Sequence, residues 1–135
     1  MKKLNVILVY NKDKSKILMC KREKEPYKGL FNLVGGKLED GETELEGAYR
    51  ELEEETGITS SDISLKHIMN FEYKLLDFEL EFFAGRLNKD KEVVDEVNKL
   101  YWIDSTENFF DVTKYAGEGN IGHMLKQLEL NEDLI

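Results

Sequence analysis

The sequence predicts an α/β domain in which a mixed β-sheet lies between helices, an α/β/α sandwich. Strand-like segments come first, one strongly acidic helix follows, and further strands lead to a final amphipathic segment. The 135 residues suit one domain and are too few for two of ordinary size. Apolar residues make up 41% of the chain, enough for a core, so we expect one domain over residues 1–135.

Before the acidic helix, the chain is expected to form strands. Residues 4–10 are apolar and rich in Val and Ile, and a polar turn separates them from a second strand-like segment at 16–22. These two segments are predicted to pair as a hairpin. A polar loop then leads to a short extended segment at 31–34, which ends at the pair Gly35-Gly36.

The acidic helix is predicted over residues 44–56 from signals at both ends. Thr43 followed three residues later by Glu46 matches a capping box, and Gly57 is suited to end the helix. Helical periodicity places four residues on the side that should pack on the sheet, namely Leu45, Ala48, Tyr49 and Leu52.

Three strands and a helix are expected after the acidic helix. Two long strands are predicted at 65–75 and 78–87 with a tight connection between them, and a further strand at 99–103. Apolar side chains alternate with glutamates at the start of the second strand, which predicts one buried face. Residues 119–130 have the apolar spacing of an amphipathic helix.

The charge is strongly negative and unevenly placed. The net charge is −9, which argues against duplex nucleic acid and anionic membranes as partners. Between Glu39 and Glu55 there are nine carboxylates and one basic residue, Arg50, so this segment alone carries −8. Such a cluster attracts cations, and an anionic substrate could approach it only with metal ions already bound.

The chain has one cysteine, which excludes an intrachain disulfide and a cysteine-rich metal site, and Cys20 is expected in the core. The start of the chain lacks a cleavage site of small residues, and no apolar run approaches membrane-spanning length, so the cytoplasm is the expected location. His67 and His123 lack metal-ligand spacing, which favours packing or surface positions for both.

The acidic helix can be interpreted in two ways. A charge-rich helix usually presents a solvated face. However, Glu53, Glu54 and Glu55 crowd the last turn, where the helix dipole is already negative. Glutamates three and four residues apart repel each other, with no interleaved lysine to offset them. Hard divalent cations such as Mg²⁺ or Mn²⁺ would relieve this repulsion, so the helix favours a metal site.

The segment from Gly36 to Ile58 resembles the Nudix box, the signature of Nudix (MutT-like) hydrolases. It matches at every defined position, namely Gly36, Glu42, Arg50, Glu51, Leu52, Glu54, Glu55, Gly57 and Ile58. The resemblance implies the Nudix fold and a loop–helix–loop that binds Mg²⁺ or Mn²⁺. It also implies hydrolysis of a diphosphate linkage by an activated water.

Site roles follow from the resemblance by position. Glu51, Glu54 and Glu55 would be metal ligands, the Gly36 carbonyl would be another, and Glu42 would hold the loop by hydrogen bonding. Arg50 would orient the box carboxylates, or would simply form a helix ion pair with Glu46 or Glu54. The proton of the attacking water would pass to a box glutamate or to Glu96, which resembles a downstream glutamate of the family and would also bind metal.

The flanking residues are similar to the branch that hydrolyses oxidised nucleoside triphosphates such as 8-oxo-dGTP. Asn32 and Lys37 would then bind substrate, with Asn32 contacting the purine, although Asn32 could equally cap a strand end. Asp111 is an imperfect match to the acidic residues that read the base in that branch. Phe71, Tyr73 and Trp102 could stack on a base, but core packing is expected for each.

The leading expectation is therefore a pyrophosphohydrolase that releases a nucleoside monophosphate and pyrophosphate, acting as a monomer or homodimer. A second hypothesis keeps the site but changes the substrate to ADP-ribose, a nucleotide-sugar or a dinucleotide polyphosphate. A third is a nucleotide-sensing Nudix domain without catalysis, which the intact box argues against.

Overall fold

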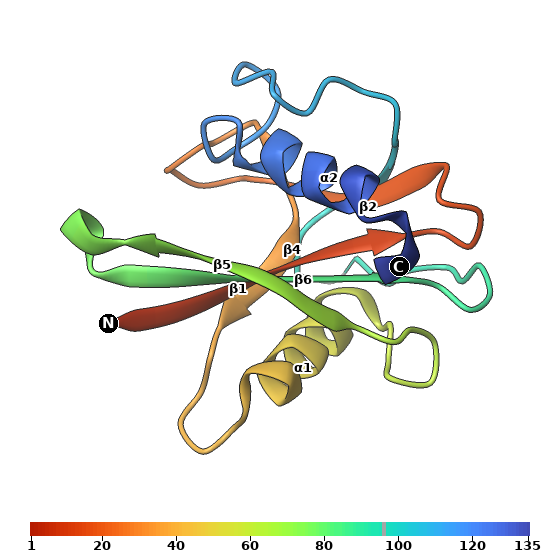
Figure 1. Ribbon diagram of the computed structural model, residues 1–135, viewed down its shortest axis with the longest axis horizontal. Coiled ribbons are helices and arrows are strands. Elements are labelled where there is room, and N and C mark those ends of the chain that lie inside the picture. Colours follow the sequence, from red (N-terminus) through yellow and green to blue (C-terminus); the bar gives the residue numbers. More distant parts are fainter. Residues whose placement is uncertain (96) are drawn as a thin grey trace.

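Two α-helices cover opposite faces of one mixed β-sheet in the computed structural model, which describes residues 1–95 and 97–135 (Figure 1). This arrangement confirms the predicted α/β/α class. The elements are β1 Lys2–Tyr10, β2 Lys16–Lys21, β3 Phe31–Asn32, β4 Val34–Lys37, α1 Glu44–Thr56, β5 Lys66–Tyr73, β6 Phe78–Arg86, β7 Leu100–Asp104 and α2 Asn120–Leu130. Short 3₁₀ turns lie at Lys74–Leu76, between β5 and β6, and at Glu132–Leu134, after α2.

β1 is the centre of the sheet. It pairs with β6 in parallel along its whole length. Its other edge is divided: residues 4–7 pair antiparallel with β4, and Tyr10 pairs with Ile17 of β2, so the predicted hairpin is confirmed. β2 then continues the sheet to β3 and β7. β4 pairs with the first half of β1 and then leads into the acidic loop that precedes α1. It therefore brings Gly35 and Gly36 beside α1.

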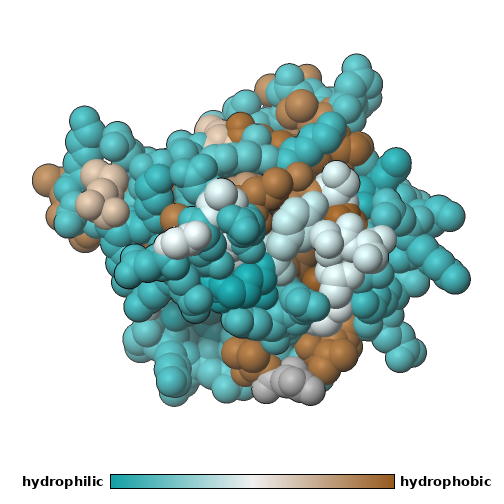
Figure 2. Space-filling view, turned by 90° about the horizontal axis from the view of Figure 1, so that it is seen from below, coloured by the Kyte–Doolittle hydropathy of each residue, from teal (hydrophilic) through white to brown (hydrophobic). Residues whose placement is uncertain are grey.

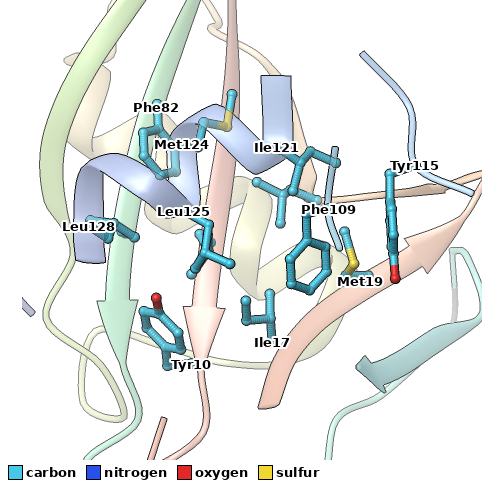
Figure 3. Close-up of a cluster of buried hydrophobic side chains, with 13 residues drawn as sticks. Tyr10, Ile17, Met19, Phe82, Phe109, Tyr115, Ile121, Met124, Leu125 and Leu128 are labelled. Atoms are coloured by element: carbon cyan, nitrogen blue, oxygen red, sulfur yellow. The ribbon is translucent and has the colours of Figure 1, made fainter. Parts of the chain in front are cut away.

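Both faces of the sheet are buried, and alternate residues of β1 show it. Ile7 and Val9 pack in a cluster with Ala48 and Leu52 of α1. Leu8 and Tyr10 pack in a second cluster under α2, together with Phe82 and the residues labelled in Figure 3. Neighbouring side chains along a strand point to opposite faces of the sheet. A strand such as β1, which is buried on both faces, therefore needs an almost continuous run of apolar residues. Cys20 is 8% exposed, as expected for a core position.

α1 begins and ends where the sequence predicts. The Thr43 hydroxyl accepts from the Glu46 amide while the Glu46 carboxylate accepts from the Thr43 amide, and Gly57 ends the helix in the left-handed conformation at φ 80°. Ala48 and Leu52 are fully buried on the sheet, but the prediction for Leu45 is wrong, since it is 43% exposed. Leu45 lies in the first turn of α1, before Ala48, the first of its apolar side chains to be buried.

Three other expectations need correction. The extended segment at 31–34 is two short strands, with Leu33 buried between them. The strand predicted to reach residue 75 ends at Tyr73, where a 3₁₀ turn forms the connection to β6. In β6 the glutamates do not mark a solvated face: Glu81 is fully buried, because α1 covers that face of the sheet.

The surface on the α1 side is mostly hydrophilic, with small hydrophobic areas near its edge (Figure 2). Within the described part of the chain, neither α-helix combines the length and the apolar character that crossing a membrane requires.

Candidate active site

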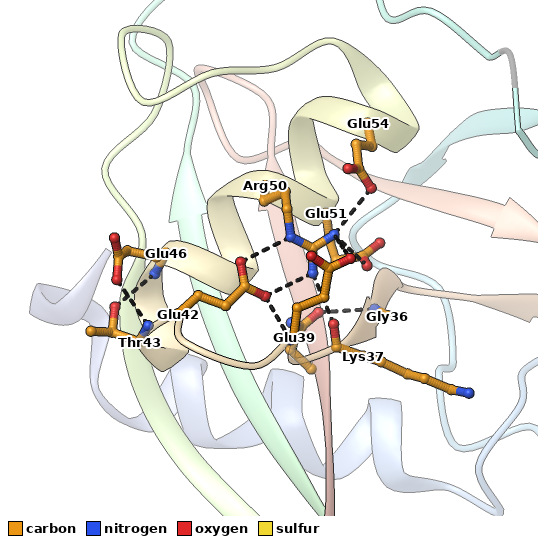
Figure 4. Close-up of polar contacts among 10 residues, drawn as sticks. Gly36, Lys37, Glu39, Glu42, Thr43, Glu46, Arg50, Glu51 and Glu54 are labelled. Atoms are coloured by element: carbon orange, nitrogen blue, oxygen red, sulfur yellow. Dashed lines mark hydrogen bonds and ion pairs between the residues drawn. The ribbon is translucent and has the colours of Figure 1, made fainter.

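Arg50 connects several carboxylates between the loop after β4 and α1 (Figure 4). Its guanidinium binds Glu42 twice, from Nε to Oε2 at 2.9 Å and from Nη2 to Oε1 at 2.8 Å. Its Nη1 also donates to Glu51 Oε1 at 3.0 Å and to Glu54 Oε2 at 3.1 Å. Hydrogen bonds from Arg50, and next from the Glu39 amide, lower the pKa of Glu42 to about 2. One cation therefore orients three glutamates of the box, whereas Glu46 serves the helix cap.

Gly36 leaves space for the Glu51 carboxylate against the backbone of β4. A Cβ at position 36 would lie 2.4 Å from Glu51 Cδ and 2.5 Å from Oε2. The Gly36 amide donates to Asn5 Oδ1 at 2.9 Å, which fixes this strand on β1. The absence of a side chain at Gly36 thus allows the Glu51 carboxylate to lie against this backbone. The resemblance assigns the Gly36 carbonyl as a metal ligand.

Gly47 has a different reason to be a glycine. A Cβ there would lie 2.8 Å from Leu38 Cδ1 and 3.0 Å from Glu42 Oε1, so the acidic loop itself packs on the helix. The cost of a glycine within a helix, roughly 1 kcal/mol relative to alanine, is therefore explained by the packing of loop on helix.

Glu55 reaches from α1 to β4, where its Oε2 accepts a hydrogen bond from the Gly35 amide at 3.0 Å. Burial is the main reason that the pKa of its carboxyl rises to about 7. The hydrogen bond from the Gly35 N–H lowers this pKa, and the charges of Glu51 and Glu54 raise it further. A partly buried carboxylate beside two others is a poor environment for a negative charge unless a cation shares it.

The box glutamates do not converge on one point among the described residues. Glu51 and Glu54 both accept from Arg50 Nη1, whereas Glu55 accepts from the Gly35 amide. The Glu54 side chain is 57% exposed. This separation is expected for like charges on one helix face without a cation between them. Glu96, predicted as a ligand or base, lies outside the described residues.

The oxygen atoms of this site are nevertheless of the type that binds Mg²⁺ or Mn²⁺. They are carboxylate oxygens and a backbone carbonyl, the hard ligands that these ions prefer. Gly36 admits the Glu51 carboxylate to the backbone, and burial, with a smaller contribution from the charges of Glu51 and Glu54, raises the pKa of Glu55. Glu51, Glu54, Glu55 and the Gly36 carbonyl are the groups that would hold such ions.

A cleft of about 710 Å³ extends from the box to the start of α2, within the usual size range for ligand sites. Glu55 and the segment 35–37 line one end. Basic side chains, Lys2, Arg22 and Lys37, line it as well. Its other walls are largely apolar, with Phe78 and Leu80 from β6 and Ile121 and Met124 from α2. The cleft therefore has a place for phosphate next to an apolar compartment.

The structure brings two predicted substrate residues to this cleft and leaves one out. Asn32 and Lys37 both line it, and Asn32 Oδ1 also accepts from the Leu33 amide at 2.9 Å, so the strand-end alternative holds too. Asp111 is not among the described residues that line the cleft, because its carboxylate accepts from the Thr113 amide and hydroxyl in a local turn. The prediction of Asp111 as a base-reading residue therefore lacks support.

Some lining residues escaped the sequence prediction. Asn120, at the start of α2, contacts the Tyr73 hydroxyl, and Tyr73 stacks on Phe78 with ring centroids 4.5 Å apart. Phe71 and Trp102 pack against the two cores, as expected. Asn120 carried no detectable signal, because it reaches the cleft only through the packing of α2 across the sheet.

Comparison with known proteins agrees with this geometry. A NUDIX domain model matches residues 1–118. An ADP-ribose pyrophosphatase of Methanocaldococcus jannaschii is 52% identical over 44 residues, which cover 33% of this chain and 26% of that protein. The chain spans less than a third of the length of the curated relatives it matches.

Solved structures share the fold. An Ap4A hydrolase of C. elegans has a TM-score of 0.77 at 20% identity, covering 100% of both chains. A structure of MutT, from work on the Aliivibrio salmonicida and Vibrio cholerae proteins, has a TM-score of 0.71 at 24% identity and covers 94% of this chain and 95% of that one. With the family model matching most of its length and the Nudix box intact, this chain belongs to the NUDIX domain family.

Proposed function

We propose that this chain hydrolyses the diphosphate linkage of a nucleotide-type substrate with Mg²⁺ or Mn²⁺. The observation that carries the proposal is the cleft that joins the box to an apolar compartment. Glu55, Gly36 and Lys37, which suit metal and phosphates, line the same cleft as aromatic and amide side chains, which suit a base. Nucleotides have these two parts, one anionic and one flat and largely apolar.

The residues divide the work as follows. Bound Mg²⁺ or Mn²⁺ would neutralise phosphate charge and activate a water molecule. Glu51, Glu54, Glu55 and the Gly36 carbonyl would hold the ions, and Arg50 keeps Glu51 and Glu54 in place. Lys2, Arg22 and Lys37 would attract the phosphates into the cleft. Water would attack one phosphorus as the bond to the other phosphate breaks, and a box glutamate or Glu96 would take the proton from the water.

For the substrate, a nucleoside triphosphate such as 8-oxo-dGTP is the leading candidate. Asn32 lines the cleft, and its amide can present both a donor and an acceptor to a base edge. The products would be a nucleoside monophosphate and pyrophosphate. ADP-ribose is the second candidate, because a stretch of 44 residues is 52% identical to an ADP-ribose pyrophosphatase.

A substrate panel with purified protein and Mg²⁺ tests the proposal. We expect turnover of at least one compound, with a nucleoside triphosphate, oxidised or not, giving the highest kcat/KM. A higher kcat/KM for ADP-ribose than for every triphosphate would make ADP-ribose the assigned substrate in place of a nucleoside triphosphate. Binding of a nucleotide without any turnover in the whole panel would support a sensing domain and refute the enzyme.

Gly36→Ala is expected to lower kcat by roughly 100-fold with little loss of stability, because a misplacement of about 1 Å in a catalytic group can cost that much. The new Cβ would meet only the mobile end of Glu51, at 2.4 Å from Cδ, and push the carboxylate away from β4. Kinetics and thermal melting of the same sample measure the two effects.

Gly35→Ala is the contrasting variant. Gly35 has φ 155°, and a Cβ there would lie 2.1 Å from the Asn5 carbonyl oxygen, which is backbone and cannot yield. This variant should unfold at a much lower temperature than Gly36→Ala. Full activity in Gly36→Ala would show that the position of Glu51 beside β4 has no part in the reaction.

A further inference from the structure

Glu81 is a buried carboxylate that receives no hydrogen bond from a donor among the residues that the structure describes. Its exposed fraction is 0%, and neither carboxylate oxygen has a hydrogen-bond partner. It lies in β6 on the face that is covered by α1, two residues before Phe83 on that same face. A carboxylate in such a place is strongly disfavoured unless it takes a proton or meets a cation.

Two further side chains converge on Glu81. Glu44, the first residue of α1, and His67 of β5 each bring one ligand atom to within 4.8 Å of a Glu81 oxygen and of each other. A β-bulge interrupts the pairing of β5 with β6 between His67 and Met69, and bulges commonly redirect a side chain. The His67 ring stacks on Phe83, with centroids 4.5 Å apart, which holds it on the α1 face.

The hydrogen bonds of His67 prepare it as a ligand. Its Nε2 contacts Asn70 Oδ1, and Asn70 Nδ2 donates in turn to Glu79 Oε1 at 2.6 Å. Because an amide oxygen only accepts, the hydrogen of the neutral ring lies on Nε2 and the lone pair on Nδ1. Histidines that bind metal are commonly fixed by donating their other ring N–H to an oxygen in this way.

We propose that Glu44, His67 and Glu81 form a second metal site, which binds one Zn²⁺ ion or a similar divalent transition metal and ties the start of α1 to β5 and β6. Two carboxylates with one imidazole suit Zn²⁺ better than Mg²⁺ or Ca²⁺, which prefer oxygen ligands alone. The ligand atoms around tetrahedral Zn²⁺ lie about 3.4 Å apart, so the side chains close in by roughly 1 Å.

This site is separate from the box glutamates assigned to catalysis, although Glu44 lies within the box segment. Glu44 precedes Glu51 by about two helical turns, roughly 10 Å along the axis of α1. In the absence of an ion, Lys3 supplies positive charge, with its Nζ 3.0 Å from Glu44 Oε1. Burial, and next the charge of Glu44, raise the pKa of Glu81, while Lys3 and His67 lower it. A divalent ion would replace Lys3 at Glu44 and satisfy both glutamates, a structural role at the helix start.

The test uses the full chain with the box disabled by Glu51→Gln and Glu55→Gln. Equilibrium dialysis against Zn²⁺ should leave one ion per chain, and thermal melting should show a rise with Zn²⁺. Adding Glu81→Gln or His67→Gln should weaken Zn²⁺ binding at least tenfold and remove the rise. Glu81→Gln keeps the side-chain volume and removes a buried charge, so it should fold at least as stably without metal.

His123→Gln is the matched control, since the chain has two histidines and His123 is exposed on α2. It should bind Zn²⁺ as the parent does. In NMR spectra, the ring signals of His67 should shift with one equivalent of Zn²⁺ and those of His123 should not. No Zn²⁺ bound by the box-disabled protein, or binding that Glu81→Gln leaves unchanged, would overturn the proposal.

Discussion

Replacing Glu55 with glutamine is expected to lower turnover by roughly 10²- to 10⁴-fold, the range for losing a positioned acid–base group. Glutamine keeps the volume of Glu55 and can still accept the hydrogen bond that the Gly35 amide donates at 3.0 Å. It lacks the negative charge that we propose binds the metal ion. Steady-state kinetics at saturating Mg²⁺ measure this effect, and unchanged kcat/KM would remove Glu55 from the mechanism.

The same variant is expected to be more stable than the wild type in metal-free buffer above neutral pH. Burial raises the pKa of the Glu55 carboxyl to about 7, from 4.5 as the ordinary value. The folded state therefore holds this proton more tightly, and ionisation of Glu55 destabilises it progressively as the pH rises from about 4.5 to about 7. At pH 8 the variant should melt about 3–6 °C higher, and at pH 4 the difference should vanish.

Saturating Mg²⁺ provides the internal control for this stability effect. The ion should raise the melting temperature of the wild type more than that of Glu55→Gln, because the variant has lost a ligand. A variant that melts below the wild type at pH 8 without metal would show that the Glu55 charge stabilises the fold by itself.

Arg50→Ala is expected to have the second large effect, a loss of about 1–2 kcal/mol in the free energy of unfolding at pH 7, less than for a fully buried ion pair. It removes both hydrogen bonds to Glu42 and leaves Glu51 and Glu54 without their shared cation. Turnover should fall as well, since these carboxylates lose their orientation. Urea denaturation measures the stability, and kinetics measure the turnover.

The pH dependence identifies the contact with Glu42 as the source. Arg50 lowers the folded-state pKa of Glu42 to about 2, against 4.5 as the ordinary value. The stability from this pair is therefore fully present above about pH 4.5 and is lost as the pH falls through about 2. The difference between wild type and Arg50→Ala should shrink on acidification. Arg86→Ala, at an exposed position ending β6, is the control and should stay within about 0.5 kcal/mol at every pH.

Local signals predicted the helix of the box and much of the sheet. The Thr43–Glu46 capping box and Gly57 set both ends of α1, because these residues satisfy or terminate backbone hydrogen bonds nearby in sequence. The apolar run in residues 4–10 predicted a buried strand, and the structure shows that both of its faces are buried. The division of the β1 edge between β2 and β4 was not predictable, because the choice of partner depends on which segments return to that edge.

Burial of polar groups was the main failure. Glu81 follows the alternation typical of a solvated face, yet α1 covers that face, and only the three-dimensional packing shows this. The sequence offered no reason to assign His67 a metal role, because no other ligand lies at a metal-binding spacing from it along the chain. The fold, however, brings His67 close to Glu44 and Glu81. Within the box, the match predicted candidate metal ligands but not their present contacts, in which Glu51 and Glu54 accept from Arg50 and Glu55 accepts from Gly35.

Titration of Mn²⁺ into the protein by calorimetry, with a non-hydrolysable nucleotide analogue present, tests the box as a metal centre most directly. The wild type should bind Mn²⁺ in the box, and Glu51→Gln with Glu55→Gln should remove that binding while the analogue-free protein stays folded. Identical Mn²⁺ isotherms for the wild type and the double variant would contradict the assignment of these glutamates as the ligands that hold a diphosphate for hydrolysis.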